Sequence, residues 1–157
     1  MQKLLFLLLI PFLAIGQANE QLNEYHSKGV PSATEMVSMN DVKVNYGAPF
    51  GQRYYEKGSS SPYTGWLSAR YDNGKLESIS QYKDGYGNGL WMNFDPDGNI
   101  ESQGTLVNNK TIGPAKLFYE DGSVKASGEY VHVKNKVGWW YFYNRQGKVV
   151  SKRFFTK

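Results

Sequence analysis

The sequence predicts an all-β fold, an elongated antiparallel β-meander built from tandem hairpin repeats of about 24 residues. Three observations support this class. Aromatic residues make up 15% of the chain and favour strands, while 17 glycines favour turns. Pairs of glycines recur at an almost constant spacing. Short aromatic runs stand before most of the turn-forming sequences, as expected for strands that end in hairpin loops.

The first residues predict an export signal. Lys3 precedes an apolar run over residues 4–13, and small residues follow in Ala14-Ile15-Gly16. The run is too short to span a bilayer, although an uncleaved anchor or a buried strand is the alternative interpretation. We expect a signal peptide over residues 1–16, cleaved after Gly16 or after Ala18. The chain contains no cysteine, so it is not expected to be a lipoprotein, and its location is expected to be periplasmic or extracellular.

Residues 17–34 are polar and predict a linker, and residues 35–157 predict the repeat domain. A degenerate first unit is expected at about residues 41–64. There Val42, Val44 and Tyr46 alternate as in a strand. Terminal repeats are usually atypical because they cap an open stack.

Four full repeats are expected to begin at residues 65, 89, 113 and 138. Each begins with a glycine and has a second glycine nine residues later, followed after two more residues by an apolar residue. The turn glycines are Gly65, Gly74, Gly89, Gly98, Gly113, Gly122, Gly138 and Gly147.

Each unit is expected to contain two strands joined by a three-residue loop with a bulge. Pro96-Asp97-Gly98 shows the chemistry, because Pro presets φ for a type I turn and Gly accepts the left-handed position. Pairing across such a loop puts Phe94 on the face of Ile100. Strict alternation then adds Ser102, Gly104 and Leu106 to this predicted inner face.

The predicted outer face is the candidate binding surface. Its aromatic residues resemble the composition of interface hot spots, although they can equally pack on each other and hold the sheet together. A one-residue slip would exchange the two faces. The candidate binding residues are Tyr71, Trp91, Leu117, Tyr119, Trp140 and Phe142.

The motif Gly-Trp-x-x-Tyr/Phe-Tyr-x-x-Gly-Lys, followed by a strand ending in Tyr-x-x-Gly, resembles the MORN-repeat variant family of bacterial exported proteins. Residues 62–65 and 81–85 are especially similar, and the resemblance covers about residues 45–155. The third unit departs from the motif, with Pro114-Ala115 at the tryptophan position. The family is often labelled as antitoxins, so the resemblance implies a protein partner that the chain neutralises.

We expect no enzyme, no catalytic residue, no metal and no cofactor. His26 and His132 have no partner residues that would build a triad. Residues 95–99 imitate the start of a calcium loop, but the twelfth position holds Leu106 instead of Glu, so a turn is predicted.

Paired carboxylates would suggest a hydrolase, and Glu77, Glu101 and Glu129 are the candidates. Glu77 and Glu101 occupy the same repeat position, which favours surface charges. Residues 85–89 superficially resemble a phosphate loop, but no helical pattern follows them.

The formal net charge of +4 is spread along the chain and does not indicate a nucleic-acid binder. The function that this sequence predicts is an exported, non-enzymatic protein–protein interaction or scaffold module, antitoxin-like or immunity-like. The alternative is an envelope protein that binds glycan or anionic lipid. Self-association through exposed sheet edges stays open. The basic residues that would contact a membrane surface are Lys134, Lys136, Lys148, Lys152, Arg153 and Lys157.

Overall fold

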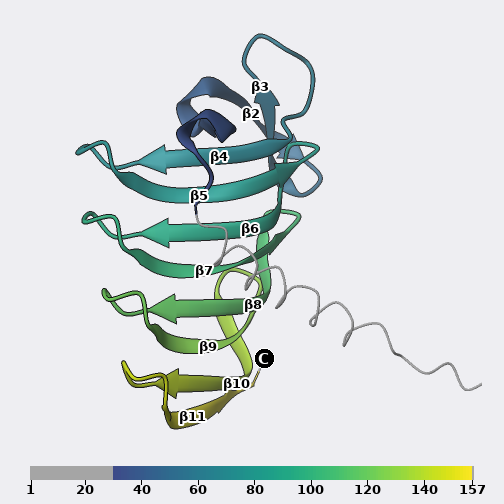
Figure 1. Cartoon of the computed structure of the whole chain (residues 1–157). Coiled ribbons are helices and arrows are strands. Elements are labelled where there is room, and N and C mark those ends of the chain that lie inside the picture. The colour runs from purple at the N-terminus through teal and green to yellow at the C-terminus, as the bar shows by residue number, and fades with distance from the viewer. Residues whose placement is uncertain (1–29, 157) are drawn as a thin grey trace, which may run out of the picture.

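The computed structural model describes residues 30–156, which form a tall stack of β-hairpins (Figure 1). The predicted signal peptide (1–16) and residues 17–29 of the predicted linker lie outside the described residues. Within the described range, nine strands form one sheet in the order β1-β4-β5-β6-β7-β8-β9-β10-β11, and β2 pairs with β3 separately. The predicted all-β meander of tandem hairpins is confirmed.

The four predicted full repeats correspond to four consecutive hairpins of the described chain. Each hairpin begins at or a few residues before the predicted first glycine. The strands are β4 (Gly65–Arg70), β5 (Leu76–Lys83), β6 (Tyr86–Phe94), β7 (Ile100–Val107), β8 (Lys110–Phe118), β9 (Val124–Val131), β10 (Asn135–Tyr143) and β11 (Val149–Phe155). The preceding elements are η1 (Ala33–Glu35), β1 (Met36–Ser38), η2 (Met39–Asp41), β2 (Val42–Ala48) and β3 (Gly51–Glu56).

The N-terminal end of the sheet differs from the prediction. The expected degenerate unit forms the separate β2–β3 hairpin, and the sheet instead begins with β1, which pairs in parallel with β4. Pro62 makes only an isolated bridge with Tyr55, since proline lacks the N–H that a further ladder would need. The β2–β3 hairpin docks through a backbone hydrogen bond of 2.8 Å from the Tyr54 N–H to the Gly85 carbonyl. The Gly85 N–H in turn donates, also at 2.8 Å, to the carbonyl of Tyr63 in the segment between β3 and β4.

The hairpin loops are the predicted three-residue loops with a bulge. In the second repeat the Gly98 N–H donates to the Asp95 carbonyl, and the Asp95 N–H donates to the Asn99 carbonyl, both at 2.9 Å. The other three loops repeat this pair of bonds. The third loop residue is a glycine in each of these loops, with φ between 76° and 93°, which other residues adopt only at a cost.

The predicted assignment of side chains to faces is wrong beyond the loop. Pairing shifts by one residue between Asn93 and Phe94, so two residues of β7 stand opposite Phe94. Phe94 does pair with Ile100, but Gly104 pairs directly with Trp91 and therefore shares its face. Equivalent shifts occur in the other three hairpins. The sequence-based prediction continued the side-chain alternation through the bulge residue, and this exchanged the inner and outer faces of the second strand of each hairpin.

Two buried tryptophans and three small residues form the core of one face. Gly104, Ala115 and Gly128 are paired in a row across β7, β8 and β9. Trp91 on β6 lies over Gly104 from one side, and Trp140 on β10 lies over Gly128 from the other. Ala115 stands where the repeat motif has tryptophan. A large residue there would compete for the space that the two indoles fill.

Neighbouring hairpins are also joined at their loops. The Tyr71 hydroxyl donates to the Phe94 carbonyl at 2.7 Å, and the Tyr119 hydroxyl donates to the Tyr143 carbonyl at 2.9 Å. Each bond connects one repeat to the next. Between the third and fourth loops, Arg145 donates to the Asp121 carboxylate at 2.8 Å.

Substituting Gly128 by alanine should destabilise the fold. A Cβ at this position would lie 2.5 Å from the Trp140 ring, so the indole would have to move. We expect the free energy of unfolding to fall by about 1–3 kcal/mol in urea titrations. Gly47→Ala is the matched control, because its Cβ would meet only Asn45 Oδ1, at 3.6 Å. Equal stability of the two variants would contradict the packing described here.

The Asp121 carboxylate should stabilise the fold in a pH-dependent way. Hydrogen bonds from Ser123 and then Arg145 lower the pKa of Asp121 from 3.8 to about 2. Because the folded-state pKa is depressed, the stabilisation is complete above the ordinary pKa and is lost as pH falls through about 2. Asp121→Asn should therefore be less stable than wild type at neutral pH, and the difference should vanish in acid-unfolding curves near pH 2. A difference that persists there would show another cause.

Candidate functional site

The predicted binding residues do not form an exposed aromatic ladder. Trp91 is 4% exposed and Trp140 is 0% exposed, so the prediction that they point outward is wrong. The physical reason is the bulge after each loop, which puts them over the strand glycines. The other four residues are half-buried; they are Tyr71, Leu117, Tyr119 and Phe142.

The opposite face of the sheet loses its cover toward the C-terminus. A row of directly paired residues crosses it from Ile79 and Met92 through Gln103 to Tyr141. The first three are at most 2% exposed, whereas Tyr141 is 40% exposed. Apolar side chains that would be core in an earlier repeat are therefore surface in the last one.

The last hairpin, β10–β11, displays a cluster of exposed rings that we call the aromatic patch: Trp139, Tyr141 and Phe154. Trp139 is 48% exposed and Phe154 is 55% exposed. The two residues are cross-strand partners, and their rings meet edge to face with centroids 5.3 Å apart. The Lys152 ammonium lies 4.9 Å from the Trp139 ring centroid. Sequence reasoning missed this patch because the predicted register placed Trp140, and not its neighbour Trp139, on the exposed face.

The net positive charge of the chain is concentrated in the segment that contains this hairpin. Residues 130–157 contain seven lysines and arginines and no Asp or Glu, whereas residues 1–129 contain eleven basic and fourteen acidic residues. The net charge of +4 for the whole chain does not show this difference between the two segments. The absence of acidic residues after Glu129 is visible in the sequence and is the signal that could have identified the site.

Two of these lysines cover the buried tryptophans. The Lys134 ammonium lies 4.9 Å from the Trp91 ring centroid. The Lys136 ammonium lies 4.5 Å from the Trp140 centroid and 5.5 Å from that of Phe155. Burial, and secondarily the charge of Arg153, lower the pKa of Lys136. Cation–π attraction thus contributes to the core on this face.

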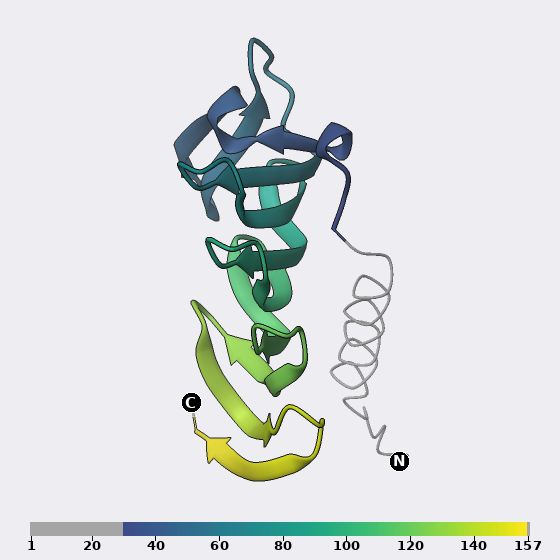
Figure 2. The same ribbon diagram turned by 60° about the vertical axis from the view of Figure 1, so that its left-hand side comes forward.

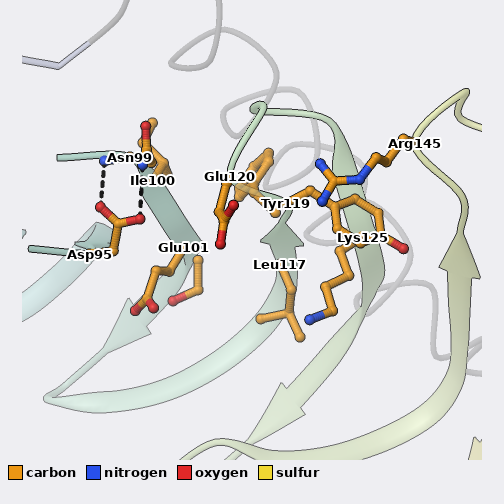
Figure 3. A pocket seen from close by; sticks show the side chains of 11 residues that line it. Asp95, Asn99, Ile100, Glu101, Leu117, Tyr119, Glu120, Lys125 and Arg145 are labelled. Carbon is orange, nitrogen blue, oxygen red and sulfur yellow. Dashed lines mark hydrogen bonds between the residues drawn. The ribbon is translucent and has the colours of Figure 1, made fainter. Parts of the chain in front are cut away.

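A hollow of about 680 Å³ lies beside the loops of the second and third hairpins (Figure 3). Two of the charged residues that line it, Asp95 and Arg145, interact with neighbouring side chains. The Asp95 carboxylate accepts hydrogen bonds from the Asn99 backbone N–H and side-chain amide, and Arg145 lies over the Tyr119 ring at 4.7 Å. These bonds at Asp95 confirm the predicted turn. Within residues 30–156 no group of three His, Asp or Glu side chains is arranged to hold a metal ion.

Of the other polar residues singled out from the sequence, Glu129 borders the aromatic patch, since it lines one hollow together with Trp139 and Tyr141. Glu77 on β5 and Glu101 on β7 are exposed, and Glu129 on β9 is half-buried. His132 lies in the β9–β10 turn with φ of 56°. His26 lies outside the described residues.

No helix in the described part of the chain is long and apolar enough to cross a membrane. No curated protein matches the sequence. A similar solved structure is that of a mutant of S. aureus TarM in complex with fondaparinux, α-GlcNAc-glycerol and UDP, at 13% identity and a TM-score of 0.39. The likeness covers 92% of this chain and 25% of that protein.

A family model does match the repeats. The MORN repeat variant model matches residues 68–84, 88–108 and 112–132. These segments fall in the first three hairpins of the main sheet, including the third unit, in which Ala115 replaces tryptophan. The chain therefore carries at least three consecutive MORN-variant repeats, which form the β-hairpin stack described above.

Proposed function

We propose that this chain is an exported, non-enzymatic interaction module that binds another protein through its C-terminal hairpin, β10–β11. One observation carries the proposal. The aromatic side chains of Trp139, Tyr141 and Phe154 are exposed together at the end of the sheet. In the earlier hairpins Trp91 is buried and Trp66 is half-buried. Tryptophan, tyrosine and arginine dominate the binding energy of protein interfaces.

The rest of the stack is suited to present this hairpin. The buried tryptophans and the loop-to-loop hydrogen bonds of Tyr71 and Tyr119 connect successive hairpins into one body. A contact surface at the end of such a body is held in place without reorganisation on binding, which lowers the entropic cost of association.

The resemblance to antitoxin-labelled proteins suggests the kind of work that such a module does. We extend the proposal to neutralisation of a protein partner in the periplasm or outside the cell, in the manner of an immunity protein. The apolar segment at residues 4–13 supports export.

A second function is supported by the charge of the same hairpin. Six basic residues lie in a segment that contains no acidic residue, next to exposed tryptophan and phenylalanine, and are suited to an anionic glycan or lipid surface; one of them, Arg145, is paired with Asp121 of the preceding loop. The six are Lys134, Lys136, Arg145, Lys148, Lys152 and Arg153.

Affinity capture from the envelope fraction should separate these functions. The chain carries a tag inserted between the predicted cleavage site and residue 30, so that the C-terminal hairpin is unmodified. We expect one stoichiometric protein to co-purify with wild type and to be lost with Trp139→Ala/Phe154→Ala, since both rings are about half exposed and their removal spares the core. Mass spectrometry identifies the captured protein, and thermal unfolding checks the fold.

Tyr46→Ala/Phe50→Ala is the matched control, because these rings are 72% and 50% exposed at the opposite end of the molecule. Capture that survives in the Trp139→Ala/Phe154→Ala variant would show that the C-terminal hairpin is not the contact surface. Empty capture by wild type, together with retention on anionic vesicles or polysaccharide, would favour the second function.

A further inference from the structure

Strand β11 is an open edge of the sheet. Among the described residues it has β10 on one side and no strand on the other, and six of its seven residues are exposed. The opposite edge strand, β1, is only three residues long. In Figure 2, β11 forms the end of the stack. Every second N–H and C=O of such an edge faces outward and can pair with an added strand.

Most devices that protect a sheet edge are absent from β11. The strand contains no proline, and its bulge lies at the loop end, so that residues 151–155 pair regularly with β10. What remains is charge, since Lys152 and Arg153 stand side by side in the middle of the strand. Lysine and arginine are common guards of exposed edges.

These two cations point to opposite faces because successive strand residues alternate. Each lies against a ring of its own face: Lys152 Nζ is 4.9 Å from the Trp139 centroid, and Arg153 Cζ is 5.1 Å from the Phe155 centroid. A strand added along β11 would therefore meet positive charge on both faces. No acidic residue within residues 130–156 compensates this charge.

A second copy of this chain is a poor occupant of the edge. Antiparallel pairing of two β11 strands about a twofold axis would bring Lys152 and Arg153 of one copy next to the same cations of the other. Like charges on paired strands are destabilising. The charges that reject a second copy favour a strand of opposite charge.

We infer that β11 accepts an extended acidic segment of a partner protein as a further strand of the sheet. The inference rests on the proposed protein-binding function and names the chemistry of the partner. The order of residues on β11 defines the segment: apolar residues opposite Phe154 and Phe155, two adjacent acidic residues opposite Lys152 and Arg153, and apolar residues opposite Val149 and Val150. This pattern is nearly symmetric, so it fits in either direction.

The probe is a capped, labelled peptide, Thr-Val-Val-Glu-Glu-Thr-Val-Val-Thr, whose binding to the purified chain is followed by fluorescence anisotropy. Two isomers carry N-methyl groups on alternate amides, on one edge or on the other. Because an added strand uses only one of its edges, the Kd of the two isomers should differ by about tenfold or more. Equal Kd values would mean that only charge attracts the peptide, and they would overturn the inference.

Charge reversal provides the second arm. Lys152→Glu/Arg153→Glu should weaken binding of the glutamate peptide by about tenfold or more and should create binding of the same peptide with Lys-Lys in place of Glu-Glu. Lys83→Glu/Lys110→Glu is the matched control, with the same change of net charge at exposed positions outside the C-terminal hairpin. Binding that falls equally in both variants would overturn the inference.

Other occupants of the edge have distinct results. The inference would be overturned if the purified chain dimerised through β11, as judged by sedimentation velocity of the wild type compared with the charge-reversed variant. Binding of phosphatidylglycerol vesicles that is lost in that variant while the peptide isomers bind equally would also overturn it. If no peptide binds but envelope capture still depends on Trp139 and Phe154, the inference fails and the proposed function stands.

Discussion

The stack depends on the packing of indole rings directly over strand glycines. Residues 65–155 form a single sheet, so a face of that sheet has no second layer of strands to cover it. Trp91 and Trp140 cover part of this face, because they pack on Gly104 and Gly128, where the absence of a Cβ lets the indole ring approach the backbone. A sheet can in this way build a core within the thickness of its own side chains.

This arrangement explains why the third repeat departs from its neighbours. The two indoles approach from β6 and β10 toward β8, the middle one of the three strands between them, and Ala115 is the residue of β8 in that row. Along the stack, two large residues thus flank three small ones. Lys134 and Lys136 then cover the indoles, so that part of the positive charge has a structural role.

The two ends of the stack differ in kind. At the N-terminal end of the sheet a short parallel strand and a docked hairpin cover it. At the C-terminal end, among residues 30–156, β11 has no strand on its outer side and is basic and lined with exposed rings. Repeat proteins commonly need a cap at each end because an uncovered repeat exposes apolar surface. This uncapped end is the surface through which we propose that the chain binds its partner.

The sequence by itself determined the hairpin array, because glycine spacing, three-residue turns that end in glycine and aromatic runs act locally and leave little choice of element. It also contained the charge division, since Glu129 is the last acidic residue. Only the tertiary structure decided which tryptophans are core and which are surface. A single bulge residue after each loop exchanges the two faces, and it depends on how the paired strands fit together, which no one-dimensional alternation records. Trp139 and Trp140 are adjacent in the chain, yet one is 48% exposed and the other fully buried, because successive strand residues lie on opposite faces of one sheet.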